Sequence, residues 1–291
     1  MGARTEVLGC ETGGMSASAS AQVRFTKHEG AGNDFLVLLD VEDEIKIDEA
    51  LARGLCDRRR GVGADGVIRV TGGHDGADLS MELRNADGGT AATSGNGLRC
   101  LAQAAVEAGL VEPPRFTVST EAGIKTIEYF SGPHPGVASA SVGMGSVALG
   151  EELAEVMNGN RARMVDTGNL HLVVLLESTD SVESLDVSSV GPRLSKDRGG
   201  GINVEFIALG SQPDELVLRV WENGVGETLA CGTGSCAAAA AAGSWGIVGG
   251  SVKVHNPGGT LDVTVDDSGA VALAGPVRKV ADVWVDLSLL T

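Results

Sequence analysis

Apolar and polar positions alternate in two stretches that lie far apart in the chain. In residues 79–85, "LSMELRN", the apolar Leu79, Met81 and Leu83 alternate with polar residues, and in residues 216–222, "LVLRVWE", Leu216, Leu218 and Val220 occupy the same alternate positions. A period of two is typical of a strand with one buried face. Each stretch leads into a Gly-x-Gly turn and a run of small apolar residues. The pattern therefore predicts a strand, a turn and a helix, twice.

The two stretches belong to an internal repeat. Residues 79–97 align with residues 216–234 without a gap at an offset of 137, since 231 − 94 = 137, and two further segments match at offsets of 136 and 138. The aligned polar pairs are Asn85 with Glu222, Ser94 with Cys231, Asn33 with Asn169, and Asp65 with Asn203. Glycine-rich loops can align by chance. Three segments in the same order at near-constant spacing nevertheless favour a duplicated unit.

The repeat predicts two homologous halves, 22–137 and 138–277, with "GPHPG" at 132–136 as the linker. Each half supplies mostly strands and one helix after the Gly-x-Gly turn. Six consecutive alanines, 237–242, favour a helix that a sheet can surround closely, because no bulky side chain keeps the sheet away. The stretch from Val277 onward resembles a strand and has no partner in the repeat.

Composition narrows the classes of partner. The 291 residues carry a net charge of −17, and the 22 basic residues form no long stripe, which argues against a nucleic-acid or anionic-membrane surface. No apolar run is long enough to span a membrane. Residues 1–21 lack the pattern of a secretory signal and predict a disordered tail. The five cysteines form no CxxC pair, which suits a reducing cytoplasm.

The paired turns predict an anion site with a reactive residue on each side. A helix start offers free N–H groups and the positive end of the helix dipole, so two facing starts would hold one carboxylate. Ser94 and Cys231 would then point at the ligand from opposite faces. A helix start is expected to lower the pKa of a thiol such as Cys231. Two groups on opposite faces of one carbon can invert a stereocentre by proton transfer.

Simpler roles compete with this interpretation. A lone cysteine in a small-residue helix is usually a buried apolar residue, which we expect for Cys56, Cys100 and Cys236. Ser94 could be a plain helix cap. The five histidines show no metal-ligand spacing, no phosphate-loop lysine follows the glycines, and no motif requires a cofactor. The sequence therefore predicts a site that binds a small molecule without a metal ion or cofactor.

Seven motifs together resemble the diaminopimelate epimerase family. They are "HEGAGNDFLVL", "DRRRGVGADG", "RNADGG", "SGNGLRC", "VDTGNLH", "NVEF" and "GVGETLACGTGSCAAA", in this order between residues 23 and 262. The resemblance implies an α+β fold of two pseudo-symmetric domains, each a mostly antiparallel sheet or barrel around a central helix, with the site in the cleft between them. It also implies that residues 278–291 return to the first domain.

The resemblance further implies a cofactor-independent isomerase of lysine and peptidoglycan-precursor biosynthesis, and it assigns roles by position. Cys231 and Ser94 would be the two proton-transferring residues, with Glu222 and His171 beside the reacting centre. Contacts to the substrate are implied for Asn33, Asn85, Gly95, Asn96, Asn169, Asn203, Asn223, Gly232 and Thr233. The oligomeric state stays open, with a homodimer among the options.

Three positions depart from the family pattern. Ser94 stands where the family has its other catalytic cysteine, and a hydroxyl is a far weaker acid than a thiol. Asn223 stands where an arginine usually binds the distal carboxylate. Leu170 replaces a usual proline, which loosens the loop. Two alternatives to an epimerase therefore remain: a one-thiol isomerase or dehydratase acting on another amino acid, and a ligand-binding paralogue without catalysis.

Overall fold

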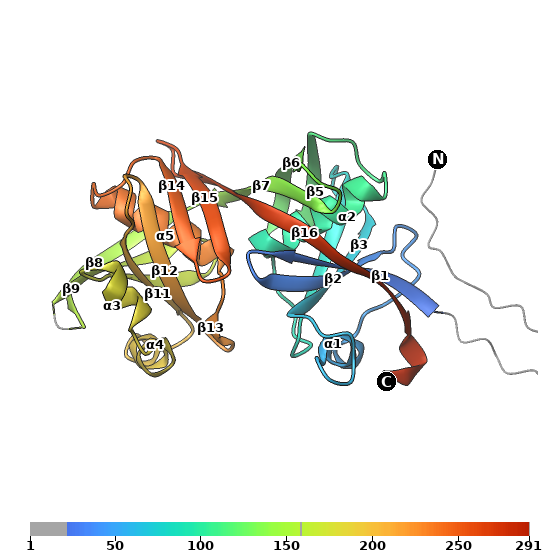
Figure 1. Ribbon diagram of the computed structural model, residues 1–291, viewed down its shortest axis with the longest axis horizontal. Coiled ribbons are helices and arrows are strands. Elements are labelled where there is room, and N and C mark those ends of the chain that lie inside the picture. Colours follow the sequence, from blue (N-terminus) through green and yellow to red (C-terminus); the bar gives the residue numbers. More distant parts are fainter. Residues whose placement is uncertain (1–21, 158, 291) are drawn as a thin grey trace, which may run out of the picture.

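The computed structural model describes residues 22–157 and 159–290, so the tail predicted for residues 1–21 lies outside the described residues. Two lobes lie side by side and are joined by long strands (Figure 1). The first lobe contains β1 (Gln22–Gly30), β2 (Asn33–Leu39), α1 (Glu49–Cys56), β3 (Gly66–Gly72), β4 (Leu79–Asn85), α2 (Gly95–Glu107), β5 (Arg115–Thr120), β6 (Gly123–Ser131) and the start of β7 (Val137–Ser146).

The second lobe repeats this order with additions. It contains β8 (Ala148–Val156), β9 (Asn160–Asp166), β10 (Leu170–Leu175), α3 (Thr179–Glu183), α4 (Val187–Lys196), β11 (Asn203–Leu209), β12 (Glu215–Glu222), β13 (Gly226–Thr228), α5 (Gly232–Ser244), β14 (Ser251–Asn256), β15 (Gly259–Val265) and β16 (Ala270–Asp286), which leads into the 3-10 turn η1 (Leu287–Leu289). The α+β fold with two pseudo-symmetric lobes is as predicted.

The crossing strand β16 closes the first lobe into a barrel. Residues 270–278 of β16 pair with β7, and residues 278–286 of the same strand pair with β1, so β1 to β7 and β16 form a closed ring. In the other direction, β7 passes directly into β8, which pairs with β9, and the strands from β16 through β15, β14, β12, β11, β10 and β9 to β8 form the second barrel, which stays open between β16 and β8. The first lobe therefore includes a strand from the end of the chain, and the two lobes are joined along the antiparallel β7–β16 pair.

The segment 132–136, expected to be a linker, is instead a hairpin turn. Strands β6 and β7 pair on either side of it, and the Gly132 N–H donates to the carbonyl of Val137 over 3.0 Å. Glycine and proline serve tight turns as well as linkers, so composition alone does not separate the two. The chain passes to the second lobe further on, along β7 and β8. The domain limits at 137/138 and 277/278 stay predictions.

Each barrel is filled by its Gly-x-Gly helix. Almost all of α2 is buried, and it packs against β1, β2, β7 and β16; α5 packs in the same way against β9, β10, β11 and β15. The alanine run 237–242 is buried along nearly its whole length. Small side chains allow the strands to approach the helix axis closely, so each barrel fixes where its helix begins. No helix in the described ranges is long and apolar enough to cross a membrane.

The turns of the two lobes touch on one side of the junction. The Gly258 Cα faces the backbone of Ala31 so closely that a Cβ at position 258 would lie 2.1 Å from the Ala31 carbonyl oxygen. The Gly258 N–H also donates to the carbonyl of Leu229 over 2.8 Å. Only a glycine fits between these backbone atoms, so this contact fixes the β1–β2 turn against the second lobe.

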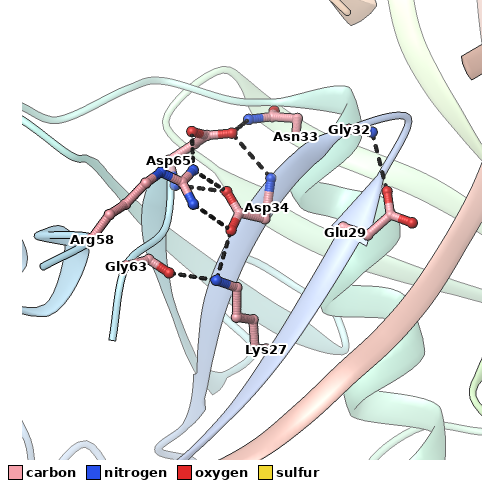
Figure 2. Close-up of polar contacts among 8 residues, drawn as sticks. All are labelled: Lys27, Glu29, Gly32, Asn33, Asp34, Arg58, Gly63 and Asp65. Carbon is pink, nitrogen blue, oxygen red and sulfur yellow. Dashed lines mark hydrogen bonds and ion pairs between the residues drawn. The ribbon is translucent and has the colours of Figure 1, made fainter. Parts of the chain in front are cut away.

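A charged network holds the β1–β2 turn from within its own lobe (Figure 2). Arg58 binds both carboxylate oxygens of Asp34, at 3.1 and 2.6 Å, and Lys27 lies 2.8 Å from the same carboxylate. Arg58 also bonds to Asp65, which accepts from the Asn33 side chain over 2.7 Å. Burial alone would raise the pKa of Asp34, but Arg58 and Lys27 outweigh it and lower that pKa.

We expect Gly258→Ala to destabilise the protein by about 1 to 3 kcal/mol, because two backbone segments would have to separate. Gly243→Ala is the matched control. Gly243 lies exposed in α5 with no atom within 4 Å of its added Cβ, so that change should be neutral or stabilising. Urea unfolding of both variants measures the difference. Equal stability of the two would contradict the tight contact.

The Asp34 network predicts an acid-dependent contribution to stability. A carboxylate whose pKa is lower in the folded state stabilises the fold above its unfolded pKa of about 4, and this contribution is lost as the pH falls through the folded value. Arg58→Gln should therefore cost about 1 kcal/mol near pH 7, since Arg58 is half-exposed, and less near pH 3. Urea titrations at both pH values measure it. Arg115→Gln, which alters an exposed pair with Glu128, should show no such trend.

Candidate active site

The starts of α2 and α5 meet between the two barrels. A Cβ at Gly232 would lie 3.6 Å from the Gly95 Cα, so the first residues of the two helices are in contact. Ser94 and Cys231 are the caps: the Ser94 hydroxyl accepts from the Gly97 N–H over 3.0 Å, and the Cys231 Sγ accepts from the Gly234 N–H over 3.3 Å. Ser94 is thus a helix cap and also stands at the position that mirrors Cys231.

A buried amide joins the two helix starts. The Asn96 side-chain amide donates to Asn33 Oδ1 over 3.2 Å in the first lobe, and to the carbonyl of Ala230 over 3.5 Å in the second. The Asn96 oxygen accepts from Arg99 over 2.9 Å, while Arg99 also donates to the Pro276 carbonyl of the crossing strand β16. Burial lowers the pKa of Arg99 to about 10, which leaves the guanidinium charged at neutral pH. The orientation of Asn96 is therefore fixed.

Titratable groups gather around Cys231. Thr228 donates to Glu222, and the Thr233 hydroxyl lies 3.4 Å from the Cys231 Sγ. The fully buried His171 lies 2.6 Å from Glu205 through Nδ1 and 3.2 Å from Asn169 Oδ1 through Nε2; Glu205 is also fully buried. The sequence prediction placed Glu222 and His171 here, and it missed Glu205.

Electrostatics make Cys231 a thiol in the free protein, contrary to the lowered pKa that its helix position predicts. Burial raises the pKa of Cys231 well above its ordinary value, and the charges of Glu222 and Glu205 raise it further. The Gly234 N–H and the Thr233 hydroxyl oppose this but contribute less. Burial also raises the pKa of Glu222. A helix start is a partial positive charge, and two nearby carboxylates in a dry site outweigh it.

The face of the site around Ser94 is apolar in comparison. A Cβ at Gly97 would lie 3.1 Å from the Ile68 side chain, whereas a Cβ at the equivalent Gly234 would lie 2.7 Å from a Glu205 oxygen. The sheet register pairs Phe35 with Gly66 in the first lobe and His171 with Asn203 in the second. Position for position, Ile68 replaces Glu205 and Phe35 replaces His171. Gly66, rather than Asp65, is therefore the counterpart of Asn203.

The remaining predicted contact residues lie at strand ends of both lobes. Asn203 accepts from the backbone N–H of Asn223 over 2.9 Å, which places these two residues together at the end of β12. Asn169 is exposed beside His171, and Asn85 pairs with Gly66 at the end of β4. Asn169 is thus linked through His171 and Glu205 to the start of α5, whereas Asn85, Asn203 and Asn223 lie at strand ends, and the roles of all four in binding stay predictions.

Sequence reasoning had one available signal for Glu205. It is the single charged residue in the apolar run "INVEFIAL", 202–209, and a charge in a buried strand calls for a partner. Arg99 gave no comparable signal, because exposed arginines are common in helices. Within residues 22–157 and 159–290, no group of three His, Cys, Asp or Glu side chains is arranged to hold a metal ion.

Comparison with known proteins gives the same family by sequence. The family model described as diaminopimelate epimerase matches residues 25–149 and 163–280. The diaminopimelate epimerase of Parabacteroides distasonis is 37% identical over 272 residues, which cover 90% of this chain and 98% of that protein. That of Leptospira biflexa is 31% identical over 277 residues, which cover 89% and 97%.

Solved structures share the fold at low identity. A phenazine biosynthesis protein of the PhzF family from Bacillus anthracis superposes with a TM-score of 0.72 at 18% identity, covering 91% of this chain and 99% of that one. A hydroxyproline epimerase from Agrobacterium vitis has a TM-score of 0.68 at 18% identity, with 91% of each chain covered. The family match over nearly the whole described chain, together with the paired helix starts, leads to one conclusion: this chain belongs to the diaminopimelate epimerase family.

Proposed function

We propose that this chain interconverts LL- and meso-2,6-diaminopimelate without a cofactor, by proton transfer at one α-carbon. One observation carries the proposal: Ser94 and Cys231 cap two helices whose starts touch, so they approach a bound carbon from two sides. The free N–H groups at Gly95–Asn96 and Gly232–Thr233 would hold the α-carboxylate and stabilise the negative charge that develops when the proton leaves.

The Cys231 face would remove the proton. Cys231 is a thiol at rest, so its own proton must first pass to a neighbouring group, and Glu222 is in hydrogen-bond reach. The resulting thiolate takes the α-proton, and the electron pair moves into the bound carboxylate. Ser94, or a water molecule held by it, would return a proton to the opposite face. A hydroxyl donates a proton less readily than a thiol, so we expect this second step to limit the rate.

A second candidate follows from the apolar surroundings of Ser94. Ile68 and Phe35 occupy the positions that carry Glu205 and His171 on the other face, so within the described chain these two positions give Ser94 no equivalent base. A related one-face isomerase or dehydratase, with Cys231 acting alone, would need no second base. The two candidates differ in whether exchange is accompanied by inversion.

Proton exchange in deuterated water distinguishes them. The enzyme is incubated separately with LL-diaminopimelate and with the meso form, and the products are followed by NMR. We expect deuterium at the α-carbon together with inversion. Incorporation without inversion, from one stereoisomer only, would support one-face chemistry by Cys231. A lack of incorporation from both would exclude diaminopimelate as the substrate.

Ser94→Cys should raise the epimerisation rate by about 100-fold, because a thiol donates and accepts the proton more readily. The measurement is kcat for LL-diaminopimelate by NMR or polarimetry. Ser188→Cys adds a thiol to the exposed face of α4 and should leave kcat unchanged. An unaltered rate in Ser94→Cys would mean that position 94 does not limit proton transfer.

Asn223→Arg should tighten the binding of diaminopimelate by about tenfold, through a charge-assisted pair with its distal carboxylate. Lysine lacks that carboxylate and serves as the comparison ligand, whose affinity should stay the same. Gln212→Arg is the control, because it adds the same charge at an exposed position before β12, at the opposite end of that strand from Asn223. Calorimetry of the three proteins with both ligands provides the measurement. Equal gains for both ligands would show a nonspecific charge effect.

A further inference from the structure

Glu205 is a buried carboxylate with an incomplete set of partners. It lies on β11 inside the second barrel, fully buried, and one of its oxygens faces His171 Nδ1 at 2.6 Å. Its other oxygen has no hydrogen-bond partner among the described residues. A buried carboxyl group is costly unless a hydrogen-bonding partner faces it. His171 is the group that the structure places there.

The His171 ring is held from both of its nitrogens. Its Nδ1 faces a Glu205 oxygen and its Nε2 faces the Asn169 side-chain oxygen, so both nitrogens meet acceptors. Asn169 Oδ1 also accepts from the Thr167 hydroxyl over 3.0 Å, which agrees with the amide orientation. The ring plane is thereby fixed from two directions, with Glu205 as the closer partner.

Glu205 lies directly against the start of α5 and carries His171 with it. A Cβ at Gly234 would be 2.7 Å from Glu205 Oε1 and 3.3 Å from the Cys231 Sγ, so Gly234 separates the carboxylate from the thiol. Any larger residue would displace one of the two. In the first barrel the same place beside Gly97 is filled by Ile68, and no carboxylate is present there. The pair is therefore not required by the barrel fold itself.

We propose that Glu205 is a positioning residue that fixes His171 beside Cys231 and thereby makes the Cys231 face of the site competent for proton transfer. The inference rests on the proposed function for its kinetic part. Glu205 does not need to touch the substrate, because it acts through His171. Its contribution should therefore appear in kcat and should vanish when His171 is absent.

The test combines a double-mutant cycle, read by enzyme kinetics, with an NMR measurement that needs no substrate. Glu205→Gln keeps the shape of the side chain and removes its charge, and we expect kcat for diaminopimelate to fall about 100-fold with KM nearly unchanged. In a His171→Gln background the same change should have little further effect. Glu215→Gln is the matched control, because it alters a second His–Glu pair, with His255, elsewhere in the same barrel. A normal kcat in Glu205→Gln would overturn the proposal. So would a double variant whose loss of kcat equals the product of the losses in the two single variants.

The NMR measurement follows the proton on Nδ1 of the His171 ring. A short hydrogen bond to a buried carboxylate shifts the Nδ1 proton well downfield, so histidine-labelled wild-type protein should show a resonance that His171→Gln and Glu205→Gln lose and Glu215→Gln keeps. Its absence from the wild type, or its survival in Glu205→Gln, refutes the pairing even if a variant is unstable. Because this measurement needs no substrate, it tests the His171–Glu205 pairing even if diaminopimelate proves not to be the substrate.

Discussion

The close approach of two helix starts at the junction of the barrels governs this structure. Gly95 and Gly232 bring the α2 and α5 backbones into contact, and any side chain at either position would meet Leu273 within 3 Å. Free N–H groups from both helices can therefore converge on one anion, which a single helix start offers from one side only. The barrels and the shared strands β7 and β16 set the positions of the two helices and hold them there.

The two lobes are alike in fold and unequal in chemistry. Around Cys231 the second barrel places Glu222, His171 and Glu205, while the first barrel places Phe35 and Ile68 at the positions of the last two. Burial is offset by the contact between His171 and Glu205 and by the hydrogen bond that Thr228 donates to Glu222. A duplicated scaffold thus provides the geometry, and the residues that differ between the copies decide which face can carry protons.

Several features could be predicted because they depend on local pattern. Alternating strands at 79–85 and 216–222, helices after each Gly-x-Gly and the pairing of Ser94 with Cys231 follow from periodicity and repetition. The linker assigned to 132–136 was wrong, since a turn sequence does not reveal which strands pair around it. The repeat partner of Asn203 was one residue off, because sheet register is set by hydrogen bonding between strands that are distant in the sequence.

The sequence by itself determined the family, the repeat, the two opposed caps and the residue types at the site, because these depend on the order and spacing of residues. Tertiary structure alone decided the protonation of Cys231 and the partner of His171. A pKa depends on burial and on charges brought close by folding, and Glu205 lies 26 residues from Cys231 in the chain, since 231 − 205 = 26. Local sequence predicted a helix start that lowers that pKa, and the folded environment reversed the direction.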